Sequence, residues 1–147
     1  GYGAPYLAFS KDGKAMIGQN GLDANVNELR TAVGGSHVLV KDGFPLKFDM
    51  TDEFIYAGHP RTLAGVTEDG RIILAVVDGR QPDFSNGASA ERCALLMISL
   101  GAKDAMNLDG GGSSAMVINR DGKMTAENSG SDGALRRVYN SVIVVKN

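Results

Sequence analysis

The sequence predicts an α+β fold, a single domain in which a mixed, mainly antiparallel β-sheet packs around one principal buried helix at about residues 88–100. Three observations predict this fold. Short runs rich in valine and isoleucine recur between turns that carry Asp-Gly, at 12–13, 42–43, 69–70 and 121–122. One longer apolar stretch has helical spacing. The length of 147 residues suits one domain with a core of its own.

The first half of the chain predicts antiparallel strands. Residues 6–10 and 15–18 flank an Asp-Gly turn and predict a hairpin. The polar residues 19–31 are ambiguous and fit a short helical turn. Residues 32–40 predict a strand, in which the pair Gly34 and Gly35 indicates a bulge or a close backbone approach.

The second half predicts a hairpin, the principal helix and a last strand. Residues 63–67 and 71–77 form the clearest hairpin, and the apolar run 72–77 predicts a central strand buried on both faces. The helix at 88–100 is apolar nearly all round and should be largely buried; Asn86 or Ser89 can cap it, and Gly101 can end it. Residues 142–145 predict a strand at the centre of the sheet.

The densest polar chemistry lies in one glycine turn that joins the predicted strands 105–108 and 115–118. This turn holds Asn107, Asp109, Gly110, Gly111, Gly112, Ser113 and Ser114. Three glycines let backbone N–H groups approach a ligand and form a nest for an anion. A plain tight turn is the alternative, but the flanking carboxylate, amide and hydroxyls favour a binding or catalytic site. The run lacks the lysine of a phosphate-binding P-loop.

Two carboxylates, Asp78 and Asp109, each follow an apolar run, so they could meet at one end of the sheet. Paired carboxylates are the groups that glycosidic hydrolysis needs. The alternative is that each aspartate caps its own turn, and for Asp78 the two readings are equally open. Asn107 and Asn140 could orient a sugar hydroxyl or acetamido group, or could satisfy buried backbone groups.

Composition excludes several classes of function. The formal charge of −2 and the scattered arginines argue against nucleic acid as a partner. No apolar run is long enough for membrane insertion. The chain has no metal-ligand spacing around His37 and His59, so we expect no metal site and no cofactor, with the need for a divalent cation left open. The single cysteine, Cys93, excludes an internal disulfide and predicts a core residue. The first residues contain no signal peptide and suggest a processed piece.

Several spaced motifs resemble the phosphodiester glycosidase domain family, the family of the lysosomal uncovering enzyme that removes N-acetylglucosamine from a phosphodiester-linked sugar. The resemblance covers about residues 30–146. Its motifs are Asn-Leu-Asp-Gly-Gly-Gly-Ser-Ser at 107–114, His-Pro-Arg-Thr at 59–62, Val-Asp-Gly-Arg at 77–80, Ser-Asn-Gly-Ala at 85–88, Leu-Gly-Ala at 100–102, and Arg136, Val138 and Asn140.

This resemblance implies a hydrolase that cleaves the glycosidic bond of a sugar 1-phosphodiester, giving free sugar and a phosphomonoester. Because they fall inside the motifs, Arg61, Arg80 and Arg136 become candidates for gripping phosphate with two parallel hydrogen bonds. Glu91 is otherwise a charge in the first turn of the helix, and only the resemblance places it near the site. The resemblance also favours an extracellular or cell-surface location and a phosphorylated carbohydrate or cell-wall glycan as the partner.

The sequence departs from the family pattern in three places. An N-terminal motif rich in asparagine and glycine is missing, so we expect that a segment was cut away, is supplied by a companion chain, or is absent from a shortened form. Ala115 stands where the family more often has threonine, and residues 137–140 lack the usual proline and serine. The rival hypothesis is therefore a binding module that holds an anionic sugar or cell-wall polymer without cleaving it, within a larger surface or phage-type assembly.

Overall fold

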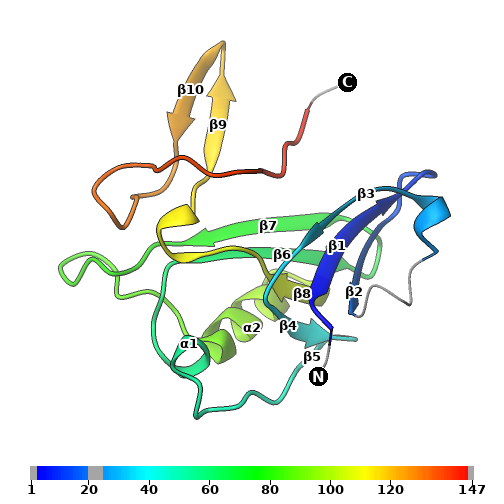
Figure 1. Ribbon diagram of the computed structural model, residues 1–147, viewed down its shortest axis with the longest axis horizontal. Helices are drawn as coiled ribbons and strands as arrows, with labels where there is room; N and C mark the ends of the chain where they lie inside the picture. The colour runs from blue at the N-terminus through cyan, green and yellow to red at the C-terminus, as the bar shows by residue number, and fades with distance from the viewer. Residues whose placement is uncertain (1–2, 20–24, 146–147) are drawn as a thin grey trace.

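The computed structural model describes residues 3–19 and 25–145. The described chain folds into three β-sheets and one long helix (Figure 1). A five-stranded sheet has the order β5-β4-β8-β6-β7, a three-stranded sheet has the order β2-β1-β3, and β9 pairs with β10 in a separate hairpin. Every strand pair within the described residues is antiparallel. The predicted α+β class is confirmed, with the strands divided among three sheets.

The elements have the following bounds: β1 Pro5–Ser10, β2 Ala15–Gln19, η1 Val26–Glu28, β3 Leu29–Gly34, β4 His37–Lys41, β5 Phe44–Pro45, α1 Glu53–Tyr56, β6 Arg61–Thr67, β7 Ile72–Val77, α2 Ala90–Ser99, β8 Ala102–Asn107, η2 Gly111–Ser113, β9 Val117–Arg120 and β10 Lys123–Ala126.

The five-stranded sheet lies between the helix α2 and the three-stranded sheet, so the protein has two apolar cores. Successive residues of the central strands β6 and β8 point to opposite faces. Leu63 and Ala105 therefore pack with α2 in the first core, whereas Ala64 and Met106 pack with Leu7 of β1 in the second. Burial on both faces explains why the middle of β6, residues 63–66, and residues 105–106 of β8 carry no polar side chain.

The predicted first hairpin is confirmed as β1 and β2. The predicted helical turn in residues 19–31 is seen as the 3₁₀ helix η1, and residues 20–24 of that segment lie outside the described residues. The predicted strand at 32–40 is instead two strands, because β3 belongs to the three-stranded sheet and β4 to the five-stranded sheet. The chain crosses between them at Gly35 and Ser36. A Cβ atom at Gly35 would collide with the carbonyl oxygen of Asn107, so the predicted close backbone approach is confirmed.

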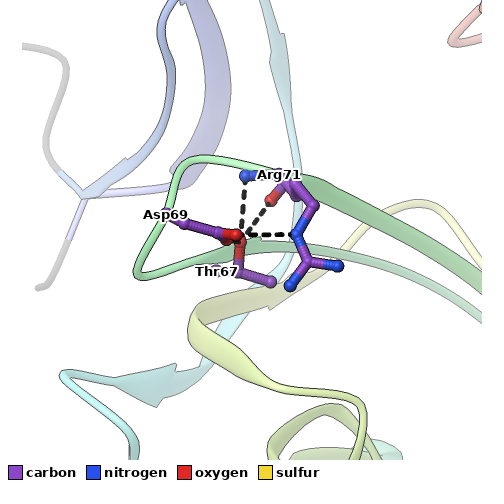
Figure 2. A network of polar contacts seen from close by, with 3 residues as sticks. All are labelled: Thr67, Asp69 and Arg71. Atoms are coloured by element: carbon purple, nitrogen blue, oxygen red, sulfur yellow. Dashed lines mark hydrogen bonds and ion pairs between the residues drawn. The ribbon is translucent and has the colours of Figure 1, made fainter.

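The predicted hairpin of β6 and β7 is also confirmed, and side chains lock its turn (Figure 2). The hydroxyl of Thr67 donates to the carboxylate of Asp69 and accepts from the amide of Arg71 at 2.9 Å. The guanidinium of Arg71 donates to the other Asp69 oxygen at 2.9 Å. The hydrogen bonds from Thr67 and then Arg71 hold the pKa of Asp69 below its ordinary value, because both stabilise the charged form.

The prediction that residues 72–77 form a central strand is wrong. They form β7, which lies at the edge of the five-stranded sheet, and none of its residues is fully buried. The central strands are β8 and β6. A continuous apolar run does not distinguish the two places, because an edge strand of a covered sheet also packs apolar side chains on both faces.

The predicted principal helix is confirmed as α2, capped by Ser89, whose hydroxyl accepts from the amide of Arg92. The prediction that it is largely buried is wrong, because Leu95, Leu96 and Leu100 are exposed. Only one face of α2 contacts the five-stranded sheet, and the three-stranded sheet lies on the other face of that sheet. No helix in the described part of the chain is long and apolar enough to cross a membrane.

Residues 142–145 do not form the predicted central strand. They make no strand pair within the described residues, and Ile143, Val144 and Val145 are each more than 70% exposed. Val142 alone packs against the second core. A β-branched composition indicates extended backbone but cannot supply a partner strand.

Candidate active site

The glycine turn joins the end of the central strand β8 to the β9–β10 hairpin, where it lies against the start of β6. The amide of Leu108 donates to the carbonyl of Thr62 at 2.8 Å, and the amide of Gly111 donates to the carbonyl of Pro60 at 2.9 Å. Gly111 has a φ of 59° and opens the 3₁₀ turn η2. A Cβ atom at Gly110 would lie 2.9 Å from the Pro60 oxygen. Two of the three glycines are therefore required by the backbone itself.

The backbone of this turn leaves donors free for a ligand. Within the described residues, the amides of Gly110 and Gly112 have no hydrogen-bond acceptor, whereas the amides of Ser113 and Ser114 close the 3₁₀ turn at 3.1 Å. The amide between those of Gly110 and Gly112, that of Gly111, donates to Pro60, so the two free amides are not successive. Of the amides expected to form a nest for an anion, those of Gly110 and Gly112 remain free donors.

A cleft of about 470 Å³ opens beside the glycine turn. Its walls are formed by Gly34, Gly35, Ser36, Phe54, Arg80, Leu108, Asp109, Gly110, Gly111, Gly112 and Arg136. Five segments far apart in the sequence therefore meet here: the β3–β4 crossing, α1, the loop after β7, the glycine turn and the segment after β10 that carries Arg136. The volume is in the range of ordinary small-ligand sites.

Two arginines lie close to the glycine turn. Arg80 has a φ of 58°, and its Nη2 lies 3.4 Å from Nδ1 of His59. Its guanidinium passes so close to Gly111 that a Cβ atom there would lie 3.2 Å from Nη1. Arg136 donates from Nη2 to the hydroxyl of Ser113 at 2.7 Å. Neither arginine forms an ion pair within the described chain, so both charges can meet an anionic ligand.

Asp109 is exposed in the cleft, one residue after the buried Leu108. It is the sole carboxylate among the residues that line the cleft, and it makes no hydrogen bond or ion pair within the described residues. The anchored amides of Leu108 and Gly111 hold the backbone on both sides of it. Asp109 is thus an unpaired carboxylate on an anchored stretch of backbone, and it lines the same cleft as Arg80 and Arg136.

Arg61 does not line the cleft, because its side chain is buried within the fold. Its Nε donates to the carbonyl of Ala88 at 2.9 Å, and its Nη2 donates to the carbonyl of Phe54 at 2.5 Å. The guanidinium also lies 4.5 Å from the centre of the Phe54 ring. Burial lowers the pKa of Arg61. The residue joins α1 to the start of α2, and its donors are used by protein carbonyls.

Asn107 is 1% exposed and lies directly behind the cleft. Its Nδ2 donates to the hydroxyl of Ser36 at 3.0 Å and to the carbonyl of Leu108 at 2.6 Å. Its Oδ1 is buried and has no hydrogen-bond partner within the described residues. Asn107 therefore positions two segments of the cleft wall. Ser114 is also buried, and its hydroxyl accepts from Thr62 at 3.2 Å.

The structure does not bring Asp78 into the cleft beside Asp109. The carboxylate of Asp78 accepts from Nδ2 of Asn128 at 3.0 Å and from the amide of Ser129 at 3.0 and 3.1 Å. It therefore fastens the segment after β10 to the end of β7. Glu91 is an exposed residue in the first turn of α2. Neither Glu91 nor the exposed Asn140 lines the cleft.

Sequence reasoning missed the part of the cleft wall that α1 and the β3–β4 crossing form. Phe54 belongs to the four-residue helix α1 and stacks with His37 and His59, at ring-centre distances of 5.5 and 5.7 Å. So short a helix leaves no periodic signal. Gly34 and Gly35 did carry a signal of close backbone approach, but nothing in the sequence indicated which backbone was approached. Of the described residues, no group of three or more histidines, cysteines or acidic residues could hold a metal ion.

Fold and cleft together define the class of the protein, an α+β domain that presents a cationic cleft built on a glycine turn. The chain belongs to the phosphodiester glycosidase family, whose model matches residues 3–145. A relative in Bacillus subtilis (strain 168), the SPbeta prophage-derived uncharacterized protein YomE, is 33% identical over 147 residues, which cover 97% of this chain and 22% of that protein.

Solved structures share the fold. The catalytic domain of zebrafish N-acetylglucosamine-1-phosphodiester alpha-N-acetylglucosaminidase, auto-inhibited by its pro-peptide, has a TM-score of 0.72 at 23% identity and covers 93% of this chain. A putative exported protein from Burkholderia pseudomallei K96243 has a TM-score of 0.56 at 30% identity and covers 80%. The chain spans 50% of the zebrafish domain and 26% of the Burkholderia protein.

Proposed function

We propose that this chain hydrolyses the glycosidic bond of a sugar 1-phosphodiester, such as an N-acetylglucosamine-1-phosphodiester, to free sugar and a phosphomonoester. The observation that carries the proposal is the meeting of Asp109, Arg80, Arg136 and the free amides of Gly110 and Gly112 in one cleft. The cationic groups and amides would bind the phosphate, and the carboxylate would act at the anomeric carbon of the sugar.

In this mechanism the arginines and the glycine amides bind the phosphate, and Ser113 adds a hydroxyl already oriented by Arg136. Phosphate is a weakly basic leaving group, so its departure gains little from protonation. Stabilisation of its negative charge therefore replaces a strong general acid.

Asp109 then activates water or stabilises the positive charge that develops at the anomeric carbon. The water oxygen forms a bond to that carbon while the bond from the carbon to the phosphate oxygen breaks. The bonding electrons leave with the phosphate, and the proton of the water passes to Asp109 or to solvent. Family membership and the shared fold support this assignment.

Hydrolysis in oxygen-18 water tests the bond that is broken. We expect the label in the anomeric hydroxyl of the released sugar, measured by mass spectrometry before ring opening exchanges it. Label in the phosphate would mean attack at phosphorus and would replace the proposed glycosidase with a phosphodiesterase.

A second candidate function is binding without cleavage, and one observation favours it. Asp109 is alone among the lining residues as a carboxylate, whereas glycosidases generally use two. A binding module would retain a sugar 1-phosphodiester intact, and prolonged incubation followed by analysis of the recovered ligand separates the two functions.

A further inference from the structure

A second cleft, of about 600 Å³, lies next to the first on the other side of Ser36. His37 and Asp52 line this second cleft, whereas Phe54 lines the first. The His37 and Phe54 rings stack at 5.5 Å, and the carboxylate of Asp52 accepts from the amide of Phe54 at 2.9 Å. Ser36 lines both clefts. The two clefts are therefore neighbours that share one thin wall.

The polar groups of the second cleft have spare hydrogen-bonding capacity. One oxygen of Asp49 accepts from the amide and hydroxyl of Thr51, at 3.0 and 2.7 Å, and its other oxygen has no partner within the described chain. Asp52 likewise uses only one oxygen. Nδ1 of His37 is buried without a partner in the described structure, and burial lowers the pKa of this residue because it disfavours the charged form.

The charges of the two clefts differ in sign. Two arginines face one aspartate in the first cleft. Two aspartates face one lysine, Lys47, in the second, and the half-buried Phe48 adds an aromatic surface. A phosphate would be repelled by this pair of carboxylates. Carboxylate acceptors, one ammonium donor and an aromatic face instead suit the hydroxyls and the apolar face of a neutral sugar.

We propose that the second cleft binds a neutral, hydroxyl-rich sugar unit, and that the substrate is an oligosaccharide or glycan polymer whose phosphodiester lies in the first cleft. The part that concerns the substrate rests on the function proposed above. The binding of a neutral sugar at Asp49, Asp52 and Phe48 does not depend on hydrolysis.

Substrate length tests the proposal by kinetics. The double variant Asp49→Asn, Asp52→Asn retains shape and helix capping but removes both charges. We expect the ratio of kcat/KM for a tetrasaccharide 1-phosphodiester to that for the monosaccharide compound to fall about tenfold, since charged hydrogen bonds are lost for the longer substrate. Asp83→Asn, an exposed aspartate outside both clefts, is the matched control and should keep the ratio. An equal change for both substrates would overturn the proposal.

A binding experiment separates this proposal from the proposed hydrolysis. Cellotetraose and N-acetylchitotetraose should shift the amide NMR signals of residues 47–52, and inorganic phosphate should shift those of residues 110–113 without displacing the tetrasaccharide. The double variant should weaken tetrasaccharide binding about tenfold. If neither sugar perturbs residues 47–52, the second cleft is not a sugar site. If the tetrasaccharides bind but neither 1-phosphodiester substrate is hydrolysed, the proposed hydrolase is refuted and the sugar site is retained.

Discussion

At the scale of single residues, the surroundings decide what an arginine does. Arg61 and Arg136 both fall inside motifs of the family, yet Arg61 is 1% exposed and bonded to main-chain carbonyls, whereas Arg136 is exposed in the cleft and contacts Ser113. The same guanidinium therefore stabilises the fold in one place and is available to a ligand in the other.

Replacement of Arg61 by lysine should lower stability. Lysine cannot donate to the carbonyls of Ala88 and Phe54 with the same planar geometry, so the free energy of unfolding should fall by about 1–3 kcal/mol in urea denaturation. Arg136→Lys is the matched comparison. It should leave stability within about 0.5 kcal/mol but weaken binding of a sugar phosphodiester about tenfold, and binding of the free sugar much less. A loss of stability in Arg136→Lys and a loss of ligand binding in Arg61→Lys would show that Arg136 is the structural arginine and Arg61 the binding one.

Asp109→Asn should abolish catalysis and preserve the fold. The carboxylate is exposed and makes no hydrogen bond or ion pair with other described residues, so its neutral isostere opens no cavity. We expect kcat to fall about 10²–10⁴-fold, the usual contribution of a positioned acid or base, with an unchanged thermal midpoint. Near-normal turnover by the folded variant would remove Asp109 from the mechanism.

At the scale of elements, the glycine turn acts as one unit with the start of β6. Gly111 combines a positive φ with the nearby guanidinium of Arg80, whereas Gly13 has a φ of 87° in an open hairpin turn with no atom within 4 Å of a built Cβ. Substitutions at these two glycines can therefore distinguish the effect of backbone strain, which both share, from the effect of contact with Arg80, which only Gly111 has.

Gly111→Ala and Gly13→Ala should therefore destabilise the protein alike, by about 1 kcal/mol each, because both force alanine into a left-handed conformation. Only Gly111→Ala should weaken phosphate binding, since its methyl group would displace Arg80. Calorimetry with inorganic phosphate measures the difference. Equal phosphate affinity in both variants would identify residues 110–112 as a plain turn.

Helix α2 contains one thiol, that of Cys93, whose titration should change the free energy of unfolding with pH. Cys93 is fully buried, and burial raises the pKa of its thiol from 9.0 to about 11. Below pH 9 the thiol is protonated in both states, so it contributes no pH dependence. Between about pH 9 and 11 the unfolded state loses the proton first, so the free energy of unfolding should fall by at most about 2–3 kcal/mol. Cys93→Ala should remove this part of the fall in urea denaturation, and an identical pH profile would contradict it.

At the scale of the whole molecule, stability is uneven. The central strands β6 and β8 contribute side chains to both apolar cores, whereas every residue of β9 and β10 is exposed and the pair forms an isolated hairpin (Figure 1). A two-stranded hairpin without a covered face has little stability of its own.

Amide hydrogen exchange should reflect this difference. We expect amides of β9 and β10 to exchange by local opening, many times faster than those of β6 and β8, which should require global unfolding. The β6–β7 turn provides an internal comparison with intermediate protection, since side chains lock it. Equal protection of all four strands would mean that the hairpin unfolds together with the cores.

The sequence by itself determined the local structure. Asp-Gly turns placed the hairpins β1–β2 and β6–β7, helical spacing and Ser89 placed α2, and three glycines marked the turn at 110–112. Each of these depends on residues close in the chain, so composition and spacing suffice to predict it. Local chemistry also predicted that Asp109 belongs to a site, and the family resemblance added Arg80 and Arg136. The structure places all three in one cleft.

Only the tertiary structure decided which residues meet. It placed β7 at an edge and left 142–145 without a strand partner among the described residues. It also turned Asp78 toward Asn128 and Ser129 and buried Arg61 beneath Phe54. It also set the β3–β4 crossing and the short helix α1 opposite the glycine turn. These outcomes depend on contacts between residues 7 to 71 positions apart in the chain. No local pattern encodes such contacts, because they follow from how the layers pack against two cores.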